Sequence, residues 1–154
     1  MSPNPPDAGL LPFFQGDHRA CDQDWSQVEA AASADNQADA QVAWQAFNAH
    51  TRRHLDMEEG VIFPAFEDAT GMHGGGPTAM MRAEHEQMRA LLDQIGEAIA
   101  AGDLSEVLDQ GDTLLMLTQQ HNVKEEQILY PMAQQHLAPR WPALVDQLNR
   151  YLSP

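Results

Sequence analysis

The sequence predicts an all-α protein, folded as an up-down-up-down antiparallel four-helix bundle. Four long segments place apolar residues at alternating spacings of three and four, the period of an amphipathic helix. Short breaks rich in glycine, proline and aspartate separate these segments, and no segment alternates β-branched with polar residues as a strand would. A chain of 154 residues has the length of one domain. We therefore expect a single bundle domain over residues 17–154, preceded by an N-terminal arm over residues 1–16.

Proline is frequent in residues 1–16, which predicts an extended arm and no helix there. The prolines of this segment are Pro3, Pro5, Pro6 and Pro12. Apolar residues of the same segment are expected to dock the arm onto the domain. These are Leu10, Leu11, Phe13 and Phe14.

The first predicted helix runs from about residue 17 to residue 32. The second begins near Asp35 or Asn36, since either side chain can cap a helix N-terminus. A glycine-rich break over residues 71–76 ends the second helix.

The third predicted helix has Pro77 in its first turn, a position that proline favours, and it ends at Gly102. The fourth runs from about residue 105 to residue 136. Residues 143–152 are expected to form a short closing helix.

Composition excludes several classes of partner and location. The chain carries 8 Lys and Arg against 23 Asp and Glu, a net charge of −15, so phosphate-rich nucleic acids and anionic membranes would repel it. Cys21 is the only cysteine, which excludes an intrachain disulfide. No apolar run approaches the roughly 20 residues of a membrane helix, and the N-terminal segment lacks the features of a signal peptide. We expect a cytoplasmic protein.

Each of the four apolar stripes carries polar residues where the pattern calls for apolar ones. A lone histidine in such a stripe is most often a hydrogen-bonded core residue. Six such groups on inward faces are different, because burying unpaired ionised side chains costs several kcal/mol each. A cation would compensate them most directly. The six residues are His18, His54, Glu58, His85, His121 and Glu125.

The expected topology brings these six side chains to one layer. In an antiparallel bundle, the starts of the first and third helices share one end with the ends of the second and fourth helices. His54 and Glu58 are four residues apart, so they lie on one helical face. The same is true of His121 and Glu125.

An internal repeat relates the two halves of the chain at an offset of 67 residues. His18 matches His85, His54 matches His121, and Glu58 matches Glu125. Residues 54–64 align without gaps to residues 121–131, with the histidine, both glutamates and the proline identical. We therefore expect two αα-hairpins related by a pseudo-twofold axis through the site.

The matching prolines, Pro64 and Pro131, lie six residues after each glutamate of the repeat. Each is expected to kink or end its helix just beyond the site.

Two matching half-sites predict two metal ions. In this interpretation His18 and His54 bind one ion, His85 and His121 bind the other, and both glutamates bridge the pair. An oxo or hydroxo bridge would give each ion a fifth ligand and leave a sixth position open. Imidazole and carboxylate ligands suit iron, manganese or zinc. A single structural zinc would use four ligands and leave two buried groups unexplained.

These residues and their spacing resemble the hemerythrin-like, or HHE cation-binding, family over about residues 15–135. The resemblance rests on His18, on the two His-x-x-x-Glu pairs, on His85 and on the run Ile128-Leu129-Tyr130-Pro131. It implies a non-haem di-iron centre that reacts with O₂, NO or peroxide. Oxygen-carrying hemerythrins have a further histidine at the position of Arg89. We hypothesise that both metals are therefore open, which favours redox turnover, NO binding or sensing over reversible O₂ storage.

Three neighbours are candidates for supporting roles. His50 precedes His54 by one turn and is a candidate extra ligand, proton donor or packed core histidine. Asp22 and Arg89 are 67 residues apart, and each follows a ligand candidate by four residues. They are expected either to pair across the axis or to lie in solvent as separate surface charges.

The leading functional prediction is binding or sensing of O₂, NO or peroxide at a centre of two iron ions. One alternative is a di-iron enzyme, an oxidase or a peroxide-decomposing activity. Another is a structural or partner-binding bundle that holds zinc or no metal. A sensor of this kind would act through a separate protein partner.

Overall fold

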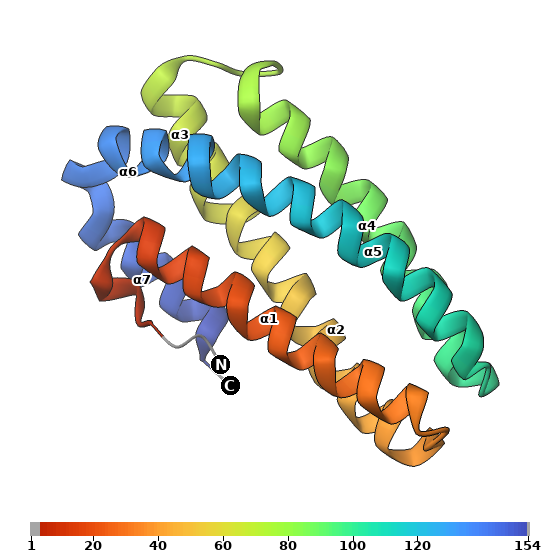
Figure 1. Ribbon diagram of the computed structural model, residues 1–154. Helices are drawn as coiled ribbons and strands as arrows, with labels where there is room; N and C mark the ends of the chain where they lie inside the picture. The colour runs from red at the N-terminus through yellow and green to blue at the C-terminus, as the bar shows by residue number, and fades with distance from the viewer. Residues whose placement is uncertain (1–3, 154) are drawn as a thin grey trace.

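The computed structural model describes residues 4–153 of the chain. Four long helices dominate it and run alternately in opposite directions, as the ribbon shows (Figure 1). They are α1 (Leu10–Ser33), α2 (Gln37–Met57), α4 (Gly76–Ala101) and α5 (Leu104–Lys124). The described residues contain no strand. The predicted all-α bundle is confirmed.

The four long helices pair in chain order around the bundle. Helix α1 packs on α2 and α4 packs on α5, and these two hairpins join through α2 against α4 and α1 against α5. The two hairpins are the two halves of the 67-residue repeat, so the structure has the arrangement that the repeat predicts.

The hairpin turns use the breaks that the sequence marks. The Asn36 side chain accepts a hydrogen bond from the Asp39 N–H and caps α2, as expected. Gly71 and Gly102 end their helices with φ of 74° and 71°, a left-handed conformation that glycine adopts without a Cβ clash.

The N-terminal segment differs from the predicted arm. Residues 6–8 form a short 3₁₀ turn, Pro6–Ala8, and α1 already begins at Leu10. Pro12 falls in the first turn of α1, where its missing N–H would have no partner in the helix, so it does not prevent the helix. Residues 1–3 of the expected arm lie outside the described residues.

The expected docking of this segment is confirmed for three of its apolar side chains, but as part of a helix. Leu10, Phe13 and Phe14 are fully buried, and Leu11 is partly buried against the same cluster. The segment is helical despite its prolines, because these side chains recur at helical spacing and join the core.

The second and fourth predicted helices continue past Pro64 and Pro131 after an irregular turn. A π-helical turn, Glu58–Ile62, links α2 to α3 (Phe63–Thr70), and a matching turn, Glu125–Leu129, links α5 to α6 (Tyr130–Leu137). Neither proline ends its helix. The irregularity precedes the proline and starts at the glutamate itself, where the π turn takes up one extra residue.

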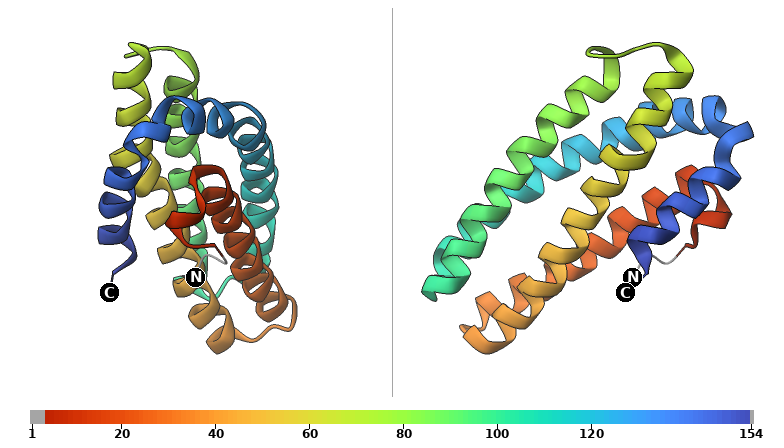
Figure 2. Two further views of the ribbon diagram at one scale, coloured as in Figure 1. Left: turned by 90° about the vertical axis from the view of Figure 1, so that its left-hand side faces the viewer. Right: turned by 180° about the vertical axis from the view of Figure 1, so that it is seen from behind.

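The chain closes with α7 (Trp141–Leu152), after a 3₁₀ turn, Ala138–Arg140. This confirms the expected short C-terminal helix. Figure 2 shows α7 lying outside the four long helices, and it packs against the π turn Glu58–Ile62 and the first turn of the chain. The Trp141 indole N–H donates to the Pro6 carbonyl at 3.1 Å.

Two apolar clusters fill the bundle, one on each side of the predicted site. The first gathers residues of α3, α6 and α7 with the start of α1 and the end of α2, including Phe14 and Met57. The second fills the hairpin-turn half, including Trp25, Phe47 and Leu92. The polar layer lies between them, so each cluster shields it from one end.

Among the described residues, no helix has the length and apolar character needed to cross a membrane.

Candidate metal centre

The structure brings the six predicted residues together in one buried layer. All six side chains are 5% exposed or less. They come from α1, α2, the two π turns, α4 and α5, as the antiparallel topology predicts. They are His18, His54, Glu58, His85, His121 and Glu125.

The four histidines form two pairs. The rings of His18 and His54 have centroids 4.7 Å apart, and those of His85 and His121 have centroids 5.0 Å apart. The pairs are those that the sequence assigned to separate metal ions. Each pair is close to Glu125, so donor atoms able to hold a metal gather on both sides of the axis.

Glu125 lies between the two histidine pairs. Its Oε1 is 3.1 Å from His18 Nε2 and 3.2 Å from His121 Nε2. Two ligand atoms at right angles around one ion, each about 2.1 Å from it, stand about 3 Å apart. The Glu125 carboxylate therefore has the position of a bridge between two half-sites.

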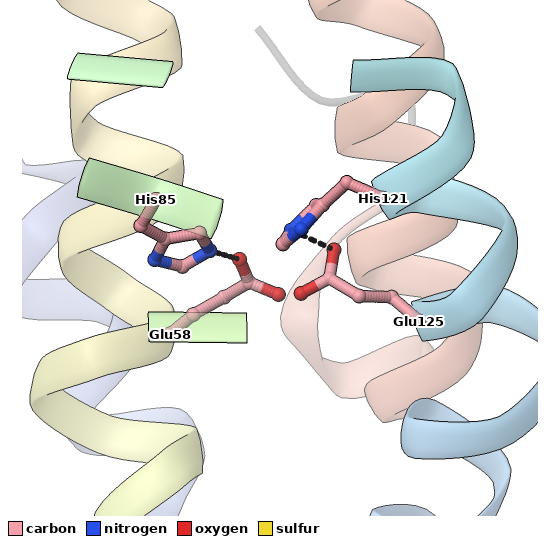
Figure 3. A group of neighbouring side chains, drawn as sticks. All are labelled: Glu58, His85, His121 and Glu125. Carbon is pink, nitrogen blue, oxygen red and sulfur yellow. Dashed lines mark ion pairs between the residues drawn. The ribbon is translucent and has the colours of Figure 1, made fainter. Parts of the chain in front are cut away.

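Glu58 has the corresponding position on the opposite side. Its Oε1 is 3.1 Å from His85 Nε2 and 3.4 Å from His54 Nε2. The two carboxylates point toward each other from opposite helices in Figure 3. The π turns begin at these two glutamates, so the irregular turn aims each carboxylate into the layer.

A second shell of carboxylates fixes the four imidazole rings. Each Nδ1 donates to an outer carboxylate and each Nε2 faces the centre. This is the arrangement that orients metal-binding histidines in known sites. The pairs are His18–Glu126 at 2.7 Å, His54–Asp17 at 2.7 Å, His85–Glu59 at 2.5 Å and His121–Glu84 at 2.9 Å.

Sequence reasoning missed these four outer carboxylates, although the repeat contained the signal. Asp17 and Glu84 are 67 residues apart, and so are Glu59 and Glu126. Each acidic residue is next to a candidate ligand in the chain, yet serves a histidine of another helix. The 67-residue offset identifies them when it is applied to the residues that adjoin the candidate ligands in the chain.

Arg89 and Asp22 do not form the pair that the repeat offered. Arg89 Nη1 donates to Glu59 Oε2 at 2.8 Å, so Arg89 holds the carboxylate that orients His85. Its other partners include Asp56 at 3.1 Å. Asp22 is exposed on α1 and makes no ion pair with Arg89. The pairing across the axis is thus not observed: Arg89 holds Glu59, and the exposed Asp22 lines the same cavity as His18 and Cys21.

His50 is two hydrogen bonds away from the centre. Its Nε2 bonds Asp17 Oδ1 at 2.7 Å, and the other oxygen of Asp17 accepts from His54. Its Nδ1 bonds Asp24 Oδ2 at 2.8 Å. The structure therefore places His50 behind Asp17 and outside both donor groups of the centre.

Tyr130 is a polar group of the centre that sequence reasoning gave no role. Its Oη donates to Glu58 Oε2 at 2.6 Å, and lies 2.9 Å from Glu125 Oε1 and 3.1 Å from His18 Nε2. Its repeat mate is Phe63. The Tyr130 ring stacks on His18 as the Phe63 ring stacks on His85, so one hydroxyl breaks the symmetry of the layer.

Protons compensate the layer in the metal-free chain. Burial alone would lower the pKa of a histidine, yet the glutamates on either side of each ring raise the pKa of His18 to about 10 and of His85 to about 9. Burial, with the charge of Glu125 beside it, raises the pKa of Glu58. Burial and both carboxylates also raise the pKa of Tyr130, so the phenol keeps its proton. A bound cation would displace such protons.

Four buried donor atoms of the layer have no hydrogen-bond partner among the described residues. They are Glu58 Oε1, His85 Nε2, His121 Nε2 and Glu125 Oε2. His85 Nε2 approaches Glu58 Oε1 to 3.1 Å without the alignment of a hydrogen bond. Buried polar atoms without partners are rare and costly. Imidazole nitrogens and carboxylate oxygens that converge in this way fit a metal centre.

A small apolar cavity of about 30 Å³ adjoins the layer on the His18 and His54 side. Since one water needs roughly 10–15 Å³ by the same measure, the cavity admits a molecule of about two non-hydrogen atoms. Side chains of the second apolar cluster, among them Trp25 and Met88, line its far part. The Trp25 indole N–H is buried there, and no residue that the structure describes accepts a hydrogen bond from it.

Comparison with known proteins agrees with this geometry. The family model described as the hemerythrin HHE cation-binding domain matches residues 10–133. A hemerythrin-like protein of Schizosaccharomyces pombe, described as uncharacterized, is 29% identical over 123 residues, which cover 79% of this chain and 58% of the relative. The chain thus spans about three fifths of that relative's length. No solved structure matches. With its four-helix bundle, its buried layer of four histidines and two glutamates, and this match, the chain belongs to the hemerythrin HHE cation-binding family.

Proposed function

We propose that the chain is a non-haem di-iron protein that binds or senses O₂, NO or peroxide. In this proposal His18 and His54 hold one iron, and His85 and His121 hold the other. Glu58 and Glu125, which lie between the two pairs, would supply the carboxylate oxygens of the site.

The observation that carries the proposal is the set of four buried donor atoms without hydrogen-bond partners. A packed polar core would align such atoms for hydrogen bonds, because an unpaired buried acceptor costs about 1–3 kcal/mol. Here His85 Nε2 and Glu58 Oε1 lie 3.1 Å apart without that alignment. The outer carboxylates hold the imidazoles with Nε2 toward the centre. A metal site requires this ring orientation, whereas a simple polar core does not.

The number of donors supports two ions rather than one. Four imidazoles and two carboxylates exceed the four ligands of a tetrahedral zinc site. Their mixture of nitrogen and oxygen suits iron, and manganese and zinc are the alternatives. Iron would supply the change of oxidation state and an open coordination position.

The chain's own residues prepare the centre for a small ligand. The cavity beside His18 and His54 has room for a ligand about the size of a diatomic molecule. Tyr130 keeps a proton on its hydroxyl between the two carboxylates, where it can donate a hydrogen bond. The two apolar clusters exclude bulk water from the layer.

Titration with NO tests this proposal. Iron-loaded, reduced protein is mixed with NO without oxygen, and the visible absorption and electron paramagnetic resonance spectra are followed. We expect a saturable change in wild type. Glu29→Ala is the matched control, because Glu29 is exposed and far from the centre along α1. The change should survive in Glu29→Ala and disappear in Glu125→Ala.

The three functional predictions give different results in parallel assays with peroxide. Consumption of many equivalents of peroxide per centre would support the di-iron enzyme over binding or sensing. Spectra that do not respond to NO, O₂ or peroxide in iron-loaded protein would overturn the proposal and leave the structural bundle.

A further inference from the structure

A second group of metal-binding side chains lies between α1 and α2, outside the centre. Asp17 and Cys21 are one turn apart on α1, and His50 faces them from α2. One donor atom from each lies within 4.8 Å of the others: a carboxylate oxygen, the thiol sulfur and an imidazole nitrogen. The six residues of the proposed di-iron site do not include any of these three.

His50 is oriented as the four histidines of the centre are. Its Nδ1 pairs with an outer carboxylate, Asp24 Oδ2, at 2.8 Å, and its Nε2 faces inward to Asp17 Oδ1 at 2.7 Å. A carboxylate behind an imidazole fixes the ring and raises its basicity as a ligand. The Asp24 side chain is 30% exposed, so it links this histidine to the surface.

Burial distinguishes this group from a solvated cluster of surface side chains. Asp17 is completely buried and His50 is 7% exposed. The Thr51 hydroxyl, also buried, lies beside Cys21 and has no hydrogen-bond partner among the described residues. Cys21 and Thr51 line the cavity beside the centre, which gives a small molecule a way to the group.

The internal repeat shows that the group is not a by-product of the duplicated ligand layer. The positions that match Cys21, His50 and Asp24 in the second hairpin are occupied by Met88, Leu117 and Leu91. Only the first hairpin therefore combines thiol, imidazole and carboxylate at this place.

We propose that Cys21 Sγ, His50 Nε2 and Asp17 Oδ1 form a separate site for one zinc ion, with Asp24 orienting His50. Zinc accepts sulfur, nitrogen and oxygen together, with bonds of about 2.0–2.3 Å, so its ligand atoms stand about 3.3–3.8 Å apart. Small side-chain movements bring the three donors to that spacing. A water molecule or a small ligand would occupy the fourth position, on the cavity side.

Asp17 connects this zinc site to the centre. Its Oδ1 would bind zinc while its Oδ2 accepts the Nδ1 proton of His54. One carboxylate can serve both because its two oxygens point to different partners. Replacing Asp17 would disturb both sites at once, so the test uses Cys21 and His50.

Cobalt(II), a spectroscopic substitute for zinc, tests the proposal on the full-length protein. Cys21 is the only thiol, so a thiolate-to-cobalt charge-transfer band in the near ultraviolet can arise only from this site. We expect one equivalent of Co²⁺ to saturate the band and one equivalent of Zn²⁺ to remove it. Cys21→Ser should abolish the band, and His50→Gln should weaken Co²⁺ binding at least about 10-fold.

Two further variants provide the controls. Asp24→Asn removes only the outer carboxylate and should weaken Co²⁺ binding about 10–100-fold. Glu29→Gln, exposed on the same helix about two turns beyond Cys21, should bind like wild type. Circular dichroism of each variant checks the fold, and Cys21→Ser keeps the test valid if His50→Gln does not fold.

No charge-transfer band in wild type, or unchanged affinity in His50→Gln, would overturn the zinc site. Iron counted in the same samples keeps this test apart from the proposed function. Two irons without a cobalt–thiolate band would refute only the zinc site, and a band in protein that holds no iron would support it while refuting the di-iron centre.

Discussion

Each histidine of the centre has its two ring nitrogens committed to different partners. Nδ1 donates to a carboxylate of the outer shell, and Nε2 faces the two inner glutamates. The outer shell is itself held, for example by Arg89 on Glu59 and by Lys124 on Glu84. Ring orientation therefore depends on side chains that never touch the metal.

Inner and outer glutamates are expected to differ in what they contribute to metal binding. Glu125→Ala removes the carboxylate that reaches both histidine pairs and should reduce bound iron from two ions per chain to one or none. Its neighbour in the chain provides the matched variant. Glu126→Gln changes only the partner of His18, so it should weaken the affinity for iron about 10–100-fold, while two irons still bind at saturation. Iron per chain at saturating and limiting iron measures both, and equal losses in the two variants would contradict the assignment.

Tyr130 is expected to stabilise the metal-free protein through its hydroxyl. Tyr130→Phe leaves a buried Glu58 oxygen without its 2.6 Å donor and should lower the free energy of unfolding by about 1–3 kcal/mol. Urea unfolding of metal-free protein measures this. Tyr151→Phe, at a partly exposed tyrosine of α7, should change it by less than about 0.5 kcal/mol. A Tyr130→Phe variant as stable as Tyr151→Phe would show that the Tyr130 hydroxyl contributes nothing to the free energy of unfolding.

At the scale of helices, the apolar period predicted the four long elements but not their local irregularities. The glycine breaks and the Asn36 cap are where the sequence placed them. The predicted start of the first helix is wrong, because Pro12 lies in the first turn of α1, a place that tolerates proline. The π turns could not be predicted from the ligand pattern. Their extra residue lies in Glu58–Ile62, so the spacing of His54 and Glu58 is unchanged.

Two helix glycines are expected to respond to alanine with opposite signs. A Cβ at Gly111 of α5 would overlap the buried Trp25 ring and lie 2.6 Å from Trp25 Cη2, so Gly111→Ala should destabilise the protein by about 1–3 kcal/mol. A Cβ at Gly96 of α4 would meet Trp44 at an ordinary 3.6 Å, so Gly96→Ala should stabilise it by about 0.5–1 kcal/mol.

Urea unfolding of the two variants beside wild type checks this pair. Destabilisation in both would show that the bundle is tightly packed at Gly96 as well. No loss in Gly111→Ala would contradict the contact between α1 and α5 at Trp25.

For the whole molecule, topology made the inner site predictable. Six polar residues in apolar stripes, placed by an antiparallel bundle and doubled by a 67-residue repeat, define one layer without knowledge of side-chain positions. The outer carboxylates are harder to predict. Asp17, Glu59 and Glu84 look like solvated charges in the sequence, because their partners lie on other helices, and only their place in the 67-residue repeat marks them.

Removing the metal is expected to loosen the whole bundle, since the layer joins all four long helices. A ligand present at 1,000 times its Kd stabilises the folded state by about 4 kcal/mol. For a domain of this size that corresponds to a fall in Tm of about 8–16 °C on chelation. Thermal unfolding with and without chelator measures it, and Glu125→Ala should show a much smaller shift. Equal Tm values for wild type in both conditions would contradict a metal-stabilised layer.

The most direct test of the di-iron centre is the metal content per chain, by elemental analysis of wild-type protein produced in iron-replete medium. The zinc site involves a different metal, so iron is counted separately. We predict about two irons per chain, as six inner donors in two matching halves require. No stoichiometric iron in folded protein, with zinc or without it, would contradict the di-iron centre.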